Sequence, residues 1–114
     1  MTNATPAFPA PAGALRVYDW EVNQAHPDAA PGGVCRDFEG SSWTVDRGPG
    51  RFGVTVGIVG VQHGDGRTER EVFVDRLEGY MDRLSVGQAR QLARALIFAA
   101  AEIHDGDQDA AVAW

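Results

Sequence analysis

The chain contains no lysine and only one cysteine, and both shortages restrict what it can be. All ten basic residues among its 114 residues are arginine. The single cysteine, Cys35, excludes an intramolecular disulfide and a cysteine-rich zinc site. No stretch reaches the roughly 18 consecutive apolar residues of a membrane span, and the proline-rich N-terminal sequence lacks the basic start of a signal peptide. We therefore expect a cytoplasmic protein that does not associate with membranes.

Basic residues are also outnumbered, since the chain carries ten basic and sixteen acidic residues and a net charge of −6. Four of the acidic residues lie near the C-terminal end, at Glu102, Asp105, Asp107 and Asp109. Nucleic-acid binding needs a basic face that contacts phosphates, so this balance predicts no nucleic-acid partner. The acidic end is typical of a solubilising tail.

Length and proline distribution predict one folded domain with loose ends. Residues 1–14 are rich in alanine and proline, which bury little surface and remove hydrogen-bond donors, so we expect disorder there. A single domain is predicted over residues 15–105, followed by a flexible acidic tail over 106–114. A domain of this size can bury enough surface to form one core without a metal or a disulfide.

Alternating apolar residues predict a sheet of short strands. The expected strands cover residues 15–22, 34–40, 41–46, 51–62 and 67–77. The sequences DRGPG and HGDG between them are typical of turns, and the pair Asp65-Gly66 suits a positive φ. Gly57 and Gly60 leave room for the large Phe73 or for an overlying helix.

A long amphipathic helix is predicted from residue 85 onward. Ser85 and Gln88 form the capping-box pattern that begins helices. The apolar residues at helical spacing, which we expect to face the core, are Ala89, Leu92, Ala93, Leu96, Ile97, Ala100 and Ile103. About nineteen residues at 1.5 Å per residue give a helix long enough to cross a four-stranded sheet. The predicted fold class is therefore α+β, an antiparallel meander of about four strands with this helix packed on one face.

The far side of the predicted helix carries residues that the core does not need. Phe98 points away from the apolar stripe and is flanked by small alanines. A single exposed aromatic is common and can lack a function, yet it is also a usual anchor of protein contacts. The predicted partner surface comprises Arg90, Arg94, Phe98 and Ala101. A two-fold homodimer is the simplest use of such a surface, and another protein is the alternative partner.

No pattern in the sequence assigns a catalytic residue, a metal or a cofactor. The stretch GPGRFG (48–53) has the spacing of a dinucleotide-binding loop, but it precedes a strand instead of opening a helix. His63 and Asp65 stand two residues apart, as metal ligands can, without a third ligand at short range. Cys35 would need a base within hydrogen-bond reach to act as a nucleophile, and the sequence places none there. The chemical role of these three residues stays open.

Three aromatic residues on predicted strands offer an alternative site. Tyr18, Trp20 and Trp43 can pack in the sheet or line a pocket for a small ligand. The sequence thus predicts a non-enzymatic protein that acts through protein contacts as a homodimer. A small-ligand-binding module is the alternative.

Three stretches of the sequence resemble a known group of proteins. They are FEGSSW, GVQHGDGRTER and LSVGQARQLARALIFAAAEI. The last is similar to the ending L-[ST]-x-x-Q-A-R-x-L-A-x-A-L-x-x-A-A of small actinobacterial proteins, chromosomal and phage-encoded, that are classed as domains of unknown function. The matching positions are Leu84, Ser85, Gln88, Ala89, Arg90, Leu92, Ala93, Ala95, Leu96, Ala99 and Ala100. The resemblance implies a hairpin followed by a C-terminal helix, and it implies no activity.

Overall fold

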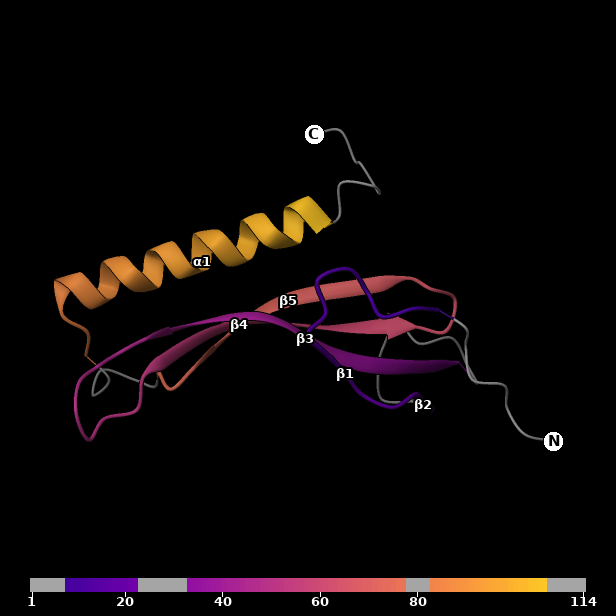
Figure 1. Ribbon diagram of the computed structural model, residues 1–114, viewed down its shortest axis with the longest axis horizontal. Helices are drawn as coiled ribbons and strands as arrows, with labels where there is room; N and C mark the ends of the chain where they lie inside the picture. The colour runs from indigo at the N-terminus through magenta and orange to yellow at the C-terminus, as the bar shows by residue number, and fades with distance from the viewer. Residues whose placement is uncertain (1–7, 23–32, 78–82, 107–114) are drawn as a thin grey trace. The chain divides into compact units, whose positions relative to one another are not determined.

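The protein has an α+β fold, in which one C-terminal helix contacts the strands of an antiparallel sheet (Figure 1). The computed structural model describes residues 8–22, 33–77 and 83–106. The elements are β1 (Arg16–Val17), β2 (Glu21–Val22), β3 (Val34–Val45), β4 (Val54–His63), β5 (Thr68–Asp75) and α1 (Val86–Gly106). The sheet order is β1-β3-β4-β5, and β2 also pairs with β3. The predicted fold class is confirmed.

β3 is a single strand of twelve residues where the sequence predicted two. The glycine and serines at 40–42 separate the predicted strands 34–40 and 41–46, but the backbone stays extended through them. Small residues at these positions permit a turn without requiring one. The strand therefore continues because its neighbours in the sheet supply partners along its length.

The strand predicted over residues 15–22 is divided into two short strands. β1 and β2 each contain two residues, and both pair with β3 in antiparallel register. Arg16 lies opposite Glu39, and Glu21 lies opposite Cys35. The register between Glu21 and Cys35 places their side chains on the same face of the sheet.

The β4–β5 hairpin closes at the predicted HGDG turn. The His63 N–H donates to the Arg67 carbonyl at 2.7 Å, and the Gly66 N–H donates to the His63 carbonyl at 2.9 Å. Gly66 has a φ of 92°, a left-handed conformation that glycine adopts without strain. The turn prediction is confirmed, and these hydrogen bonds fix the register of the two strands.

The chain divides into two compact units, which are described one at a time. Unit 1 comprises Met1–Gly40 and Val59–Glu71, and unit 2 comprises Ser41–Ile58 and Val72–Trp114. This division does not test the prediction of one domain over 15–105. The predicted disordered stretch and tail fall partly outside the described residues, which begin at residue 8 and end at residue 106.

The core of unit 2 lies between α1 and the sheet. Its buried residues are Val56 and Ile58 on β4 and Ala95 and Ala99 on α1. Partly buried side chains pack around them, namely Trp43, Leu92 and Ile103. Each fully buried valine or isoleucine side chain stabilises the fold by about 1.5–3 kcal/mol relative to an exposed one. Removal of apolar surface from water between these two elements therefore holds α1 on the sheet.

α1 begins as the sequence predicts. The Gln88 N–H donates to Ser85 Oγ at 3.1 Å, and the Ser85 N–H donates to Gln88 Oε1 at 2.8 Å. These reciprocal bonds satisfy two of the backbone donors that the first helical turn leaves unpaired. The Gln88 side chain also donates through Nε2 to the carbonyl of Asp46 at 3.2 Å, which ties the start of the helix to the end of β3.

The face that α1 presents to the sheet differs from the predicted one. Ala95 and Ala99 are buried, whereas Ile97 and Leu96 of the predicted stripe are exposed. At 3.6 residues per turn, the buried face is rotated from the predicted stripe by about one residue position, or roughly 100°. The prediction was right for Leu92 and Ile103, which pack against the core, and wrong for Leu96 and Ile97, because it ranked faces by hydrophobicity. The small side chains of Ala95 and Ala99 instead let the helix lie close to Val56.

Phe73 of unit 2 packs where the sequence leaves room for it. A Cβ atom placed on Gly57 would overlap the ring of Phe73, so this ring lies directly on the backbone of β4. Phe73 and Gly57 therefore share the face of the sheet opposite to the one that carries Val56 and Ile58, because neighbouring residues on a strand alternate between faces. The expectation that Gly57 accommodates Phe73 is confirmed.

In unit 1 the N-terminal strap, residues 8–14, is bound to side chains of three strands. Pro11 in this strap is buried. Every acceptor on the strap is a backbone carbonyl. The bonds run from Arg36 Nη2 to Phe8 O (3.2 Å), from Gln62 Nε2 to Pro9 O (3.1 Å) and from Arg70 Nη2 to Ala12 O (3.0 Å).

Phe38 is the largest buried side chain of unit 1. Its ring occupies the space above Gly60, where a Cβ atom would overlap both the ring and the Glu69 carbonyl. The Arg70 guanidinium lies 5.4 Å from the ring centroid. The backbone of β4 therefore approaches its neighbours closely at this glycine, and a side chain has no room there.

Candidate functional site

The outward surface of α1 combines exposed apolar side chains with two arginines, Arg90 and Arg94. We define the outer face of α1 as Val86, Ala93, Ile97 and Ala100, which are all exposed. Val86 is 70% exposed and Ile97 is 65% exposed. The two large aliphatic side chains of this face lie about three turns apart, with a small alanine between them. The rotation of α1 relative to the predicted stripe is what exposes Ile97.

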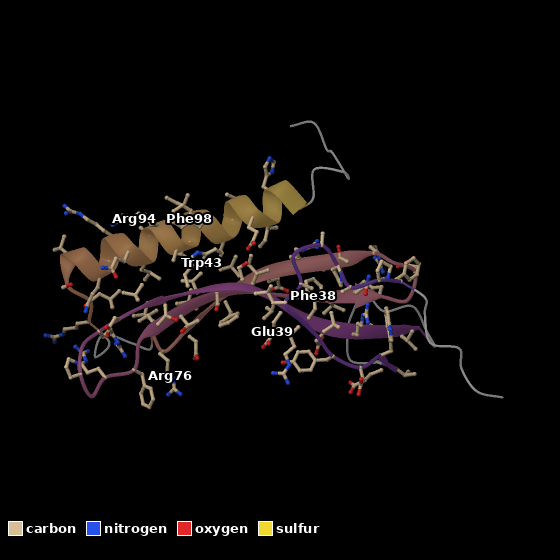
Figure 2. The ribbon with its side chains drawn as sticks, viewed as in Figure 1. Phe38, Glu39, Trp43, Arg76, Arg94 and Phe98 are labelled. Atoms are coloured by element: carbon tan, nitrogen blue, oxygen red, sulfur yellow. The ribbon has the colours of Figure 1, made fainter. Side chains whose placement is uncertain are left out.

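Two further large apolar side chains flank the outer face. Phe98 is 53% exposed on one side and Leu96 is 38% exposed on the other. In Figure 2, Arg94 and Phe98 project from α1, whereas Trp43 lies between the helix and the strands. The apolar surface of the helix is therefore wider than a single stripe, and Ile97 rather than Phe98 lies at its centre.

The residues predicted for the partner surface all lie on the exposed part of α1. Arg90, Arg94, Phe98 and Ala101 are exposed. Ala95, which the sequence places beside Phe98, is instead in the core. Val86 and Ile97 were not predicted for this surface, because hydrophobicity assigns Ile97 to the buried stripe. A signal for them exists in the sequence, since Val86, Ala93 and Ala100 repeat every seven residues, the spacing of helix-pairing surfaces.

The inner side of α1 contains one polar tie to the sheet. The Ser41 Oγ–H donates to Glu102 Oε1 at 2.7 Å, between β3 and the last turns of the helix. The second carboxylate oxygen, Oε2, is buried, and the described part of the chain offers it no hydrogen-bond partner. The Ser41 hydroxyl is therefore the hydrogen-bond donor to a carboxylate that is largely shielded from water.

We expect the substitution Ser41→Ala to destabilise the protein by about 1–3 kcal/mol, because both oxygens of the Glu102 carboxylate would then lack a partner in a partly buried site. Urea unfolding followed by circular dichroism measures this loss. Ser42→Ala is the matched control, since Ser42 is exposed on the same strand and its loss is expected to change the unfolding free energy by less than about 0.5 kcal/mol. Equal effects of the two substitutions would contradict the role assigned to Ser41.

The three aromatic residues of the alternative ligand face have separate packing partners. Trp43 is part of the unit 2 core beneath α1. In unit 1, the Arg36 guanidinium lies over the Trp20 ring, 4.5 Å from its centroid. Tyr18 is exposed and lines a small pocket. Of the three, Tyr18 alone lines that pocket.

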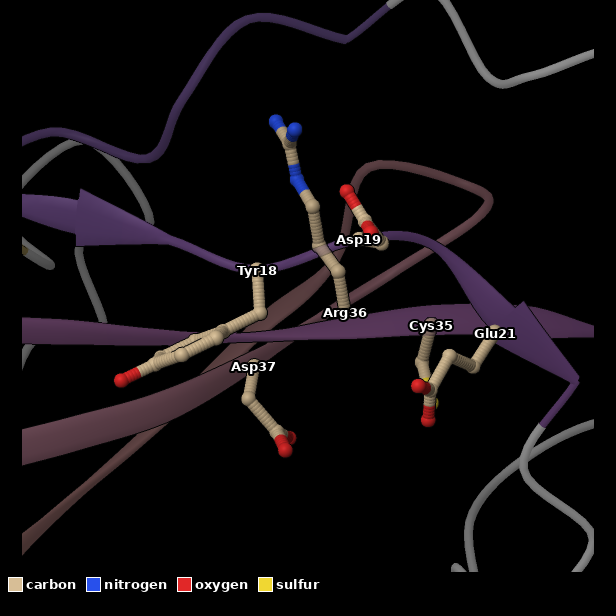
Figure 3. A pocket seen from close by; sticks show the side chains of 6 residues that line it. All are labelled: Tyr18, Asp19, Glu21, Cys35, Arg36 and Asp37. Carbon is tan, nitrogen blue, oxygen red and sulfur yellow. The ribbon is translucent and has the colours of Figure 1, made fainter.

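This pocket lies in unit 1 between β3 and the segment that contains β1 and β2 (Figure 3). Its volume is about 130 Å³, and it is lined by Tyr18, Asp19, Glu21, Cys35, Arg36 and Asp37. Figure 3 shows that the side chains of Tyr18, Cys35 and Asp37 point to one side of β3, whereas Arg36 points to the other. Asp19 points to the same side as Arg36, so the carboxylates of Glu21 and Asp37 give the Cys35 side of the pocket a negative character.

The residues whose chemical role the sequence left open are now placed. His63 is buried at the end of β4, and its Nε2 lies 2.7 Å from Oε2 of Glu69 on β5. Asp65 is exposed in the hairpin turn, and Cys35 is buried on β3. Among the described residues, no group of three or more His, Cys, Asp and Glu side chains is arranged to hold a metal ion.

Comparison with protein-family models, with curated proteins and with solved structures found no match to this chain. The resemblance to small actinobacterial proteins of unknown function stays a prediction. Within the described ranges, no helix combines the length and the apolar character that crossing a membrane requires. Functional argument therefore depends on the geometry of the two units alone.

Proposed function

We propose that the protein acts through protein–protein contacts and self-associates through the outer face of α1. The observation that carries this proposal is the exposure of Ile97 at the centre of an apolar helix surface, on the side opposite the buried Ala95 and Ala99. Aliphatic and aromatic side chains surrounded by small residues are typical of helix–helix contacts, in which the large side chains of one helix enter the spaces over the alanines of the other.

Charge favours a second copy in antiparallel orientation as the occupant. Arg90 and Arg94 are exposed in the first half of α1. An antiparallel two-fold pairing keeps the arginines of the two helices apart, whereas a parallel pairing would bring these like charges together. A two-fold axis also requires only one self-complementary surface.

The proposed interface is small. α1 has 21 residues and is about 31 Å long, and a helix with its side chains is about 10 Å wide, so one helix pair buries less than the roughly 1,200 Å² of a stable standard interface. We therefore expect reversible dimerisation in the micromolar range.

We expect Ile97→Asp to abolish dimerisation, since it places a charge at the centre of the apolar contact. Sedimentation velocity over a concentration series should show wild-type protein approaching dimer mass at high micromolar concentration and the variant remaining a monomer. Phe98→Asp should weaken association less, because Phe98 lies at the flank. Leu15→Asp is the matched control, since Leu15 is an exposed aliphatic residue of unit 1 and its replacement should leave the association unchanged.

A wild-type protein that remains monomeric throughout the series would refute the proposed self-association. So would an Ile97→Asp variant that associates as strongly as wild type. Circular dichroism of each variant establishes that it is folded, because a misfolded variant could aggregate or dissociate for other reasons.

A further inference from the structure

One face of the sheet in unit 1 carries a thiol next to an imidazole. The Gly64 N–H donates to the Val34 carbonyl at 2.8 Å, so β3 and β4 are hydrogen-bonded in a register that places Cys35 directly opposite His63. Directly opposite residues of an antiparallel pair point to the same face, with Cβ atoms about 4.5–5.5 Å apart. Two other contacts agree with this register. They are the 2.8 Å bond from Arg36 Nε to Gln62 Oε1 and the packing of Phe38 over Gly60.

Carboxylates extend this row on both sides. His63 Nε2 lies 2.7 Å from Glu69 Oε2, across the β4–β5 pair. Glu21 lies opposite Cys35 across the β2–β3 pair. The row therefore reads Glu21, Cys35, His63, Glu69 over four neighbouring strands, all in unit 1. A nucleophile, a base within reach of it, and an acid that orients the base are the arrangement that activates a cysteine.

Cys35 and His63 in this row are buried, but a pocket reaches Cys35. Cys35 is 2% exposed and His63 is 4% exposed, so water is largely excluded from both. Cys35 also lines the pocket of about 130 Å³, with Tyr18, Glu21 and Asp37 on the same side of β3 in Figure 3. A small electrophile that enters this pocket meets Cys35, whose neighbour His63 on β4 lies outside the lining residues.

We infer that Cys35 is a nucleophile for short acyl esters, with His63 as its base and Glu69 as a positioning residue. Because Glu69 occupies Nε2, the imidazole accepts the thiol proton through Nδ1. The thiolate attacks the carbonyl carbon of the ester, a carbon–sulfur bond forms, and the carbon–oxygen bond to the alcohol breaks. The imidazolium returns its proton to the departing alkoxide. Water then hydrolyses the thioester, which releases the carboxylic acid and restores the thiol.

The dimensions and charge of the pocket restrict the substrate class. A volume of about 130 Å³ accommodates an acyl group of a few heavy atoms and not a long alkyl chain. The carboxylates of Glu21 and Asp37, on the same side of β3 as Cys35, favour a cationic group over an anionic one. The substrate class is therefore short acyl esters with a neutral or positively charged alcohol.

Full-length protein mixed with para-nitrophenyl acetate at neutral pH tests the inference. We expect a burst of nitrophenolate of one equivalent per chain, with one acetyl group on Cys35 by mass spectrometry. Cys35→Ser should remove the burst. His63→Gln should slow acylation about 100-fold, the usual contribution of a general base. Glu21→Gln should accelerate acylation, since it removes a negative charge beside the thiolate.

Three controls separate activation from simple accessibility. The para-nitrophenyl ester of octanoic acid should react far more slowly than the acetate, because its chain exceeds the pocket. Acetylthiocholine should acetylate Cys35 faster than an acetyl thioester with an anionic thiol. Glu69→Gln should change the pH profile of acylation, which a purely structural role would leave unchanged.

A folded wild-type protein that gives no burst would overturn the inference. Equal acylation rates in folded wild type and folded His63→Gln would also overturn it. If His63→Gln fails to fold, Glu69→Gln decides, because a changed pH profile of acylation requires that the imidazole bound by Glu69 takes part in the reaction. An unchanged pH profile in Glu69→Gln would then identify Cys35 as a core residue.

Discussion

Gly60→Ala is expected to destabilise unit 1 by about 2–3 kcal/mol, a large part of the stability of a small domain. A methyl group at residue 60 would overlap the Phe38 ring and the Glu69 carbonyl. The ring is fully buried and has no space to move into. The carbonyl belongs to the backbone of β5, so it can move only if the strands separate. Urea unfolding monitored by far-ultraviolet circular dichroism measures the loss.

The same substitution at two other glycines provides matched controls. Gly57→Ala meets only the Phe73 ring, which is 36% exposed and can rotate outward, so we expect a loss of about 1 kcal/mol. Gly87→Ala lies in the first turn of α1, where a Cβ atom meets nothing closer than Ser85 Oγ at 3.9 Å. It is expected to stabilise the helix by about 0.5–1 kcal/mol. A loss at Gly60 no greater than that at Gly57 would contradict the account of this contact.

Ala99→Leu is the second substitution expected to have a large effect. Ala99 lies on α1 and is completely buried against β4. The three carbon atoms that leucine adds must push the helix away from Val56 or displace Trp43. Overpacking of this kind costs about 1–3 kcal/mol, and we expect the upper end because the sheet beneath cannot yield. Thermal unfolding at low protein concentration measures the loss without a contribution from association.

Ala100→Leu is the neighbouring control for this substitution. Ala100 is exposed on α1, and leucine has nearly the same helix propensity as alanine, so the unfolding free energy should change by less than about 0.5 kcal/mol. The two substitutions add the same atoms one residue apart. Similar losses at both positions would show that α1 does not pack against the sheet through Ala99.

The start of α1 could be predicted, but its buried face could not. Ser85 and Gln88 define the first turn by bonds that reach only three residues along the chain, so local sequence is sufficient. The choice of face depends on how closely the helix approaches β4, which is a property of both surfaces together. A ranking by hydrophobicity favours Ile97, whereas the shape of the contact favours Ala95 and Ala99.

The strands, too, could be predicted only where the residues that determine them are close together in the sequence. The hairpin at residues 63–66 could be predicted because its turn residues are adjacent in the sequence. The continuity of β3 could not, because the Ser41 hydroxyl has its partner 61 positions later, on α1. Glycine and serines in sequence are compatible with either a turn or a strand, and tertiary contacts decide between them.

The proximity of Cys35 and His63 depends on strand register, which sequence patterns specify weakly. A slip of one residue between β3 and β4 would move one of the two side chains to the opposite face of the sheet. The register is visible only in bonds between positions far apart, such as that from the Gly64 N–H to the Val34 carbonyl. The roles of Cys35 and His63 stayed open in the sequence for this reason.

The N-terminal strap has a consequence for how this protein can change through mutation. Strand side chains bind it through the carbonyls of Phe8, Pro9 and Ala12, and a carbonyl is present in every amino acid. Residues 9 and 12 can therefore be substituted widely without loss of these hydrogen bonds, since both side chains are exposed. Substitution is instead restricted at the donor residues, above all at Arg36 and Arg70, because few residues can replace a guanidinium group.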